Sequence, residues 1–156
     1  MFGLHFRFLL PLQLAGSGKW EAPQIARSHC RQKACSCLLC AQGIKGDRIS
    51  RHWHDLVRLD DEGFAQAAFD DKPLAKEVAD WKSKFFREKD SEGNVIDYHA
   101  AVSGKLQLVP NEDMRKELEA DYQKMVDAGL LLGDAEPFDE LMKRCEALQK
   151  RANGGE

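Results

Sequence analysis

The sequence of 156 residues lacks any uninterrupted apolar run of the roughly 18 residues that a membrane-spanning helix needs. The net charge is also small, because 23 basic and 26 acidic residues give a formal charge of −3. A slightly negative chain argues against a protein whose whole surface binds nucleic acid. No collagen-like repeat is present, and a hydrophobic fraction of 43% is too high for an obligately disordered chain. We therefore expect a globular protein that does not contact a membrane and is located in the cytoplasm.

The charge is unevenly distributed along the chain. Residues 1–47 hold six basic and two acidic side chains, a net of +4, whereas residues 48–156 hold 17 basic and 24 acidic, a net of −7. Four of the five cysteines lie in the first part, and residues 17–42 show neither helical nor alternating apolar periodicity. We expect residues 1–47 to be an irregular or disordered, cysteine-rich leader and residues 48–153 to form a helical domain.

The leader contains one group of potential metal ligands, which are Cys30, Cys35, Cys37 and Cys40 with the neighbouring His29. Four thiolates could bind zinc tetrahedrally. Structural zinc sites usually pair two short C-x2-C motifs across a longer loop, and this spacing departs from that pattern. A zinc site and an accidental cluster therefore both remain open.

Apolar residues recur at helical spacing from residue 48 onward. The stretches with this pattern are residues 49–59, 63–69, 72–86, 112–126 and 137–152. Asp71 and Asn111 stand where helix N-caps are expected. Residues 95–109 are expected to be irregular, with Leu106, Leu108 and Val109 against the helices. Four or five amphipathic helices with short connections predict an all-α helical bundle.

The helix with the most aromatic residues is predicted to form the centre of the core. Its apolar stripe consists of Leu74, Val78, Trp81 and Phe85, widened by Phe86. Cys145 lies on the apolar stripe of the last helix and is expected to be an inert core thiol. The other side chains expected to be buried are Ile49, Trp53, Leu56, Val57, Phe64, Ala67, Ala68, Met114, Leu118, Tyr122, Met125, Val126, Phe138, Leu141, Met142 and Leu148.

The helix expected at residues 49–59 carries a cluster of side chains that could do chemistry, namely Arg48, Arg51, His52, His54, Asp55 and Arg58. Arginines can grip phosphates through paired hydrogen bonds, and Asp55 could bind a metal ion or support a base. In the plainer interpretation, Arg51 and Asp55 are four residues apart on a helix and form a surface ion pair worth at most about 1 kcal/mol. The histidines would then be half-buried hydrogen-bonding groups.

A separate chemical interpretation of the same helix is metal-free RNA cleavage. Arg48 and His54 are separated by five residues, which falls within the R-x(4–6)-H pattern of helical HEPN-type ribonucleases. Such pairs are frequent by chance, so the pattern does not decide the function.

Several motifs follow one another in a fixed order along residues 48–153. They are Ile49-Ser50-Arg51-His52-Trp53-His54-Asp55-Leu56, then Lys82-x-x-Phe85-Phe86, Gly104-x-Leu106-x-Leu108-x-Pro110, Leu118-x-x-Asp121-Tyr122-x-x-Met125, and Pro137-Phe138 opening a last helix that ends at Asn153. This order resembles the AbiEii/AbiGii nucleotidyltransferase toxins, whose SRHyyDL signature is similar to the first motif.

The resemblance implies the toxin half of a bacterial toxin–antitoxin or abortive-infection system that acts in phage defence. Members of this family resemble DNA polymerase β-type nucleotidyltransferases, and some add nucleotides to the acceptor ends of tRNA with Mg2+. The resemblance places Asp55, Arg51 and His52 in a catalytic motif, with Asp55 as a metal ligand. The implied partners are a cognate antitoxin, tRNA and a nucleoside triphosphate, and the residues assigned to RNA or nucleotide contacts are Arg48, Arg58 and Lys82.

The catalytic motifs expected ahead of this helical region are missing. Nucleotidyl transfer of this kind depends on metal ions held by carboxylates, which the family supplies from a D-x-D pair. No D-x-D occurs in the 156 residues. We therefore expect a truncated and inactive C-terminal helical portion of such a toxin, with no cofactor bound by the fragment. The alternative is a helical interaction or RNA-binding protein without enzymatic activity.

Overall fold

The computed structural model describes Cys40, residues 46–131 and residues 135–154. Six helices lie wholly in this part of the chain, and they are α2 (Arg51–Asp61), α3 (Phe64–Asp70), α4 (Lys72–Phe85), α5 (Tyr98–Val102), α6 (Glu112–Asp127) and α7 (Phe138–Ala152). The described residues form no β-strand, and their only β-type pairing is an isolated bridge between Lys89 and Val95. The predicted all-α class is therefore confirmed for these residues.

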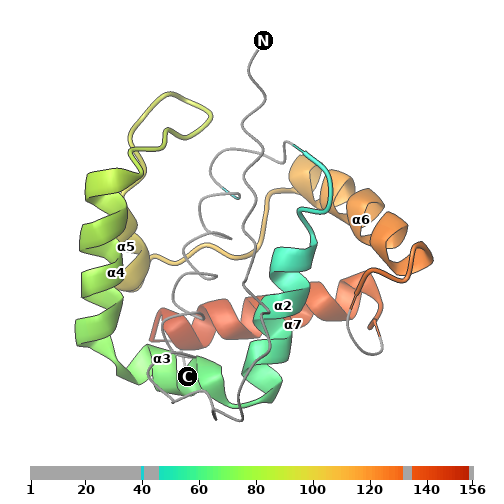
Figure 1. Cartoon of the computed structure of the whole chain (residues 1–156), viewed down its shortest axis with the longest axis horizontal. Helices are drawn as coiled ribbons and strands as arrows, with labels where there is room; N and C mark the ends of the chain where they lie inside the picture. The colour runs from blue at the N-terminus through green and yellow to red at the C-terminus, as the bar shows by residue number, and fades with distance from the viewer. Residues whose placement is uncertain (1–39, 41–45, 132–134, 155–156) are drawn as a thin grey trace, which may run out of the picture.

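The helices are arranged around α2 and α7, which cross in the middle of the molecule (Figure 1). α3 packs on α2 and leads the chain to α4, which in turn packs on α5. α6 contacts α7 and lies on the opposite side of the molecule from α4 (Figure 1). The helices thus lie across one another.

The core lies where α2 meets α7. The side chains of Trp53, Leu56, Leu141 and Cys145 are all 0% exposed, and each large apolar side chain buried in this way contributes roughly 1.5–3 kcal/mol. Burial raises the pKa of Cys145 to about 12, so the thiol stays protonated and unreactive at neutral pH. The predicted core residues confirmed on α2, α6 and α7 are Trp53, Leu56, Val57, Met114, Leu118, Tyr122, Met125, Phe138, Leu141, Met142, Cys145 and Leu148.

The prediction that the aromatic stripe of α4 forms the centre of the core is wrong. Trp81 is 45% exposed and Phe85 is 68% exposed. α4 instead buries a face of smaller side chains, which are Leu74, Ala75 and Ala79, together with Lys82. Small side chains let α4 approach α5 closely, so the wider aromatic stripe is turned outward.

The structure also corrects two shorter segments. α3 buries Ala65, Ala68 and Phe69, whereas Phe64 is only half-buried and Ala67 is exposed, so the predicted buried face was rotated around the helix. Residues 98–102, expected to be irregular, form α5. The side chain of Asp97 caps this helix by accepting hydrogen bonds from the backbone N–H groups of His99 and Ala100, each at 3.0 Å.

The predicted caps of α4 and α6 are confirmed. Asp71 accepts a hydrogen bond from the backbone N–H of Leu74 at 2.9 Å at the start of α4. Asn111 accepts one from the backbone N–H of Met114 at 3.0 Å at the start of α6. Each cap satisfies one of the backbone donors that a helix start leaves free.

The connector between α5 and α6 is fixed along α7 by two amide side chains. Asn153 accepts from the backbone N–H of Leu106 at 2.8 Å and donates to the carbonyl oxygen of the same residue at 2.9 Å. Gln149 accepts from the backbone N–H of Leu108 at 2.6 Å. On the other side, the indole N–H of Trp53 donates to the carbonyl oxygen of Leu108 at 2.7 Å. The predicted packing of Leu106 and Leu108 is confirmed, since both are buried.

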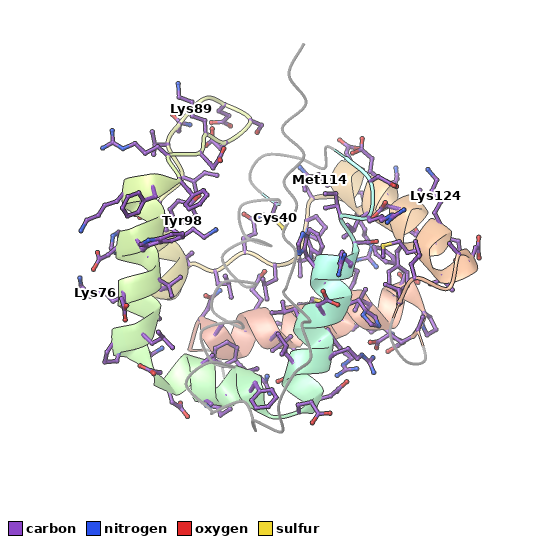
Figure 2. All side chains as sticks on the ribbon, in the orientation of Figure 1. Cys40, Lys76, Lys89, Tyr98, Met114 and Lys124 are labelled. Atoms are coloured by element: carbon purple, nitrogen blue, oxygen red, sulfur yellow. The ribbon has the colours of Figure 1, made fainter. Side chains whose placement is uncertain are left out.

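Almost all of the predicted leader at residues 1–47, including Cys30, Cys35, Cys37 and His29, lies outside the described residues. Cys40 departs from the expectation for the leader, because it is helical and buried (Figure 2). Its thiol donates to the carbonyl oxygen of Leu108 at 3.5 Å. No helix in the described ranges has the length and apolarity that crossing a membrane requires.

Candidate functional site

The N-terminal end of α2, where the candidate residues begin, is fixed by a carboxylate from α6. Asp121 is 8% exposed and accepts hydrogen bonds from the backbone N–H groups of Arg48 at 2.9 Å and Ser50 at 2.8 Å. Arg48 has a φ of 61°, a left-handed conformation that non-glycine residues rarely adopt. Two hydrogen bonds to one buried carboxylate offset the cost of this turn and set the start of α2.

Arg51 and Asp55 form the exposed part of the candidate site. The Nε atom of Arg51 lies 3.8 Å from Oδ2 of Asp55, and their side chains are 51% and 36% exposed. The other carboxylate oxygen of Asp55 lies 3.7 Å from Nδ1 of His54. The predicted neighbourhood of Arg51 and Asp55 on one helix face is therefore confirmed, and the pair presents a guanidinium and a carboxylate to solvent.

His52 lies beside this pair and is half-buried. Burial lowers the pKa of His52 below its ordinary value of 6.5, the Asp55 carboxylate partly offsets this effect, and the Arg51 guanidinium lowers the pKa further. His52 is therefore neutral at pH 7. A neutral imidazole can accept a proton or a hydrogen bond, but it adds no positive charge for binding a phosphate.

His54 points into the protein and is 1% exposed. Neither of its ring nitrogens makes a hydrogen bond within the described structure. Arg48, its partner in the ribonuclease pattern, has a side chain that is 60% exposed and lies 3.5 Å from the carboxylate of Asp47. An imidazole closed off from solvent cannot reach an RNA backbone, so the geometry does not fit the metal-free ribonuclease interpretation.

Arg58 belongs to a network of ion pairs between α2 and α7. One of its guanidinium nitrogens lies 2.8 Å from Oε1 of Glu136, and another lies 3.3 Å from Asp61. Arg144 of α7 pairs with the same two carboxylates. The side chain of Arg58 is 37% exposed. Its charge is thus shared with two carboxylates, which gives it a structural role in joining the two helices.

Lys82, the third residue assigned to RNA or nucleotide contacts, lies on α4, away from the helix that carries Arg51 and Asp55 (Figure 1). It is 7% exposed. Its ammonium nitrogen sits 5.0 Å from the ring centre of Phe86 and 6.0 Å from that of Tyr98. These distances are typical of cation–π contacts. The structure therefore does not bring Lys82 together with the candidate site on α2.

The described residues do not fit a magnesium site built around Asp55. Both oxygens of Asp55 face cationic or imidazole nitrogens, and no group of three or more His, Cys, Asp or Glu side chains within the described ranges is placed to hold a metal ion. The acidic residues near the other end of α2 are occupied, since Asp60 pairs with Arg151 and Asp61 pairs with Arg58. A lone carboxylate cannot hold the pair of metal ions that two-metal phosphoryl transfer uses.

Sequence reasoning assigned no role to two carboxylates that organise the site. Asp121 falls on the buried face of α6 by helical spacing from Leu118 and Met125, so an acidic residue within an apolar stripe was the available signal. Glu136 precedes α7 and is 15% exposed, and its ion pair with Arg58 joins residues 78 positions apart in the sequence. No local pattern marks Glu136 as the common partner of two arginines.

Comparisons of this chain with family models, with curated proteins and with solved structures give no match. The interpretation of the site therefore rests on the geometry of the α2 residues and on the order of the motifs along the chain.

Proposed function

We propose that this chain is the helical part of an AbiEii/AbiGii-type nucleotidyltransferase toxin from a bacterial toxin–antitoxin or abortive-infection system. We also propose that the 156 residues do not transfer nucleotides on their own. The observation that carries the proposal is that motifs far apart in the sequence touch one another in the fold.

Four contacts connect three pairs of these motifs. The first motif meets the Asp121 motif where the hydroxyl of Ser50 lies 3.3 Å from the sulfur of Met125, and where the N–H of Ser50 binds Asp121. It meets the Gly104–Pro110 motif through the hydrogen bond from Trp53 to Leu108. That motif is in turn bound by Asn153, at the end of the last helix.

These contacts between motifs support the family assignment because the polar groups of one motif are satisfied by groups of another. A buried carboxylate without the N–H groups that it accepts from, or a backbone N–H without its amide acceptor, carries a cost of about 1–3 kcal/mol. Residues that satisfy one another are expected to occur together and in a fixed order. By the same argument, most residues of these motifs stabilise the fold. Within the first motif, the polar side chains that remain exposed or half-buried are those of Arg51, His52 and Asp55.

The absence of nucleotidyl transfer is proposed on two grounds. No D-x-D occurs in the sequence, so a second and third carboxylate for a metal pair are not supplied by such a motif. In addition, Asp55 is engaged by Arg51 and lies beside His54. Positioning and charge neutralisation by metal ions make up most of the catalysis of phosphoryl transfer, so their loss removes the activity.

The test is an incorporation assay with the complete chain. The purified protein is incubated with tRNA, labelled nucleoside triphosphates and Mg2+, and the label transferred to tRNA is measured. We expect no more label with the wild type than with Asp55→Asn, which neutralises the carboxylate at almost constant shape. Incorporation that the wild type supports, that Asp55→Asn abolishes and that Asp127→Asn on the exposed side of α6 retains would overturn the proposal.

A helical interaction protein without enzymatic activity is the second candidate function. It is favoured by the exposure of Trp81 and Phe85, because large aromatic side chains are rarely left in solvent without a use. RNA binding is the less favoured form of this alternative, since residues 48–156 carry a net charge of −7 and repel a polyanion.

A further inference from the structure

Exposed apolar side chains gather at the C-terminal end of α4. Four large hydrophobic side chains are exposed within the described residues, and three of them, Trp81 at 45%, Phe85 at 68% and Val95 at 60%, lie on α4 or on the loop that follows it. We call these three residues the α4 patch. Trp81 and Phe85 are one helical turn apart, with ring centres separated by 5.6 Å. Clustered apolar exposure of this kind marks interaction sites more often than scattered exposure does.

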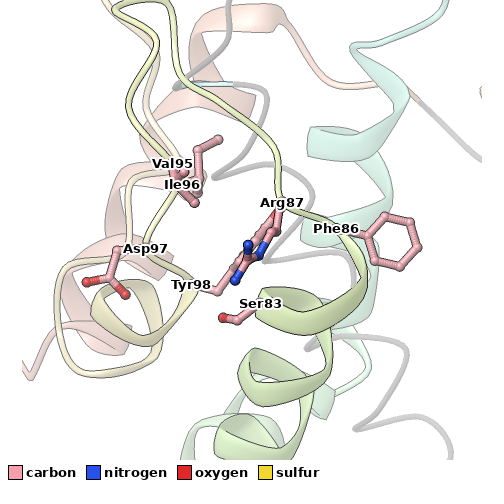
Figure 3. A pocket seen from close by; sticks show the side chains of 7 residues that line it. All are labelled: Ser83, Phe86, Arg87, Val95, Ile96, Asp97 and Tyr98. Carbon is pink, nitrogen blue, oxygen red and sulfur yellow. The ribbon is translucent and has the colours of Figure 1, made fainter.

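A cavity of about 350 Å³ adjoins the α4 patch. Its lining includes Val95 of the patch and Phe86, whose ring centre lies 5.1 Å from that of Trp81. Figure 3 shows the side chains of Arg87, Ser83 and Tyr98 at this cavity. The patch is therefore continuous with a hollow whose lining includes the guanidinium group of Arg87 and the carboxylate of Asp97.

Two exposed basic side chains, Lys84 and Arg87, lie beside the α4 patch. Residues 81–89 contain four basic residues, of which Lys82 is buried, and one acidic residue, and the adjoining residues 90–97 add three acidic residues. Lys84, three residues after Trp81, is its neighbour on the helix surface. Neither Lys84 nor Arg87 forms an ion pair within the described part of the chain, although Lys76 on the same helix lies 2.8 Å from Asp80. Two cations beside exposed aromatic rings thus remain available to an anionic partner.

We propose that the α4 patch docks an acidic amphipathic helix of a partner protein. The spacing of Trp81 and Phe85 matches apolar residues one turn apart on such a helix, in the helix-in-groove mode of recognition. Carboxylates on its rim would face Lys84 and Arg87. This inference adds the chemistry and the place of binding to the interaction role given above, and it rests on that role.

Charge argues against two other occupants of the α4 patch. Residues 1–47 of the chain carry a net charge of +4, so they would meet Lys84 and Arg87 with charges of the same sign. A second copy bound symmetrically would place these cations opposite themselves. Single-stranded RNA could stack on the aromatic rings, so the test includes it as a probe.

The test uses the full chain labelled with ¹⁵N and three probes. The first probe is a synthetic helical peptide with leucines at i, i+3, i+4 and i+7 and glutamates elsewhere. The second has lysines in place of the glutamates, and the third is a single-stranded oligouridylate. We expect the acidic peptide to shift amide signals of residues 81–87 and of Val95 in a saturable way, with no comparable shifts from the other two probes.

Four variants give the energetic test. We expect Trp81→Ala and Lys84→Glu each to weaken binding of the acidic peptide by about tenfold, the loss typical of an interface anchor. Leu130→Ala and Lys116→Glu remove an exposed apolar side chain and an exposed cation elsewhere and should leave its affinity unchanged. Because the signal map uses the wild type, a variant that fails to fold does not prevent the test.

Each remaining outcome overturns the inference in a distinguishable way. Saturable shifts at α4 from the lysine peptide or from the oligouridylate would leave an interaction role for this surface but contradict an acidic protein partner. No shift at α4 from any probe would contradict both the acidic partner and the interaction role. Equal loss of affinity in Trp81→Ala and Leu130→Ala would show that the α4 patch is not the place of binding.

Discussion

At the scale of single residues, Asp121 connects α6 with the start of α2. Its carboxylate accepts from the backbone N–H groups of Arg48 and Ser50, and Ser50 is itself 0% exposed. In Asp121→Ala both N–H groups lose their acceptor in a place that water reaches poorly. We expect the free energy of unfolding to fall by about 2 kcal/mol, measured by urea denaturation.

A matched variant separates the backbone contact from the side chain of Arg48. Arg48→Ala keeps the N–H group that binds Asp121 and removes only an exposed side chain. We expect it to change the free energy of unfolding by less than about 0.5 kcal/mol. A loss in Asp121→Ala no larger than that in Arg48→Ala would contradict the role assigned to the carboxylate.

His52 is expected to make the free energy of unfolding depend on pH. Burial is the main cause that holds the pKa of His52 below 6.5 in the fold, so between that folded value and 6.5 the unfolded chain binds more protons. The contribution of neutral His52 to stability is complete above pH 6.5 and is lost as the pH falls toward the folded pKa. We expect the free energy of unfolding to fall between pH 7.5 and pH 5.5, and this fall to be smaller in His52→Gln.

The exposed His99 provides the control for that pH dependence. It is 46% exposed and lies 3.3 Å from Asp80. His99→Gln should keep the part of the acid destabilisation that belongs to His52. Equal pH dependence in the wild type and in His52→Gln, both followed by urea denaturation, would show that the folded and unfolded states do not differ in the protonation of this imidazole.

At the scale of helices, the sequence predicted which segments are helical better than it predicted which face each one buries. The faces of α2, α6 and α7 followed from one unbroken apolar stripe on each helix. α4 carries two stripes, one aromatic and one of small residues, and spacing alone does not tell which faces the core. Ala75 and Ala79 lie on the buried face of α4, which packs on α5, and α5 itself was not predicted.

Gln149 and Asn153 hold the α5–α6 connector on α7, and their removal should loosen this connector first. Asn153→Ala leaves the N–H and the carbonyl of Leu106 without their partner, and Gln149→Ala does the same for the N–H of Leu108. We expect a loss of about 1–3 kcal/mol for each variant. Amide hydrogen exchange at Leu106 and Leu108 should speed up locally.

Lys150→Ala serves as the control for the connector. Lys150 lies on the same helix, is exposed, and pairs with Glu146 at 2.9 Å. We expect it to leave exchange at Leu106 and Leu108 unchanged, because exposed pairs of this kind contribute about 1 kcal/mol or less. Unchanged exchange in Asn153→Ala as well would contradict the proposed attachment of the connector.

At the scale of the whole molecule, the candidate site was only partly predictable. Helical spacing correctly placed Arg51 beside Asp55, since both lie on one helix. The same spacing could not reveal that Glu136 from a distant segment engages Arg58, or that Lys82 turns into the protein on another helix. Contacts between elements decide which polar side chains stay exposed, and a pattern within one helix carries no information about them.

We propose that the described residues provide no binding site for a pair of divalent cations around Asp55. The most direct measurement is paramagnetic broadening of amide signals by Mn2+, a substitute for Mg2+, with a nucleoside triphosphate present. We expect no saturable broadening centred on residues 51–55 and no difference between the wild type and Asp55→Asn. Stoichiometric broadening centred on Asp55 in the wild type, abolished in Asp55→Asn, would contradict the claim.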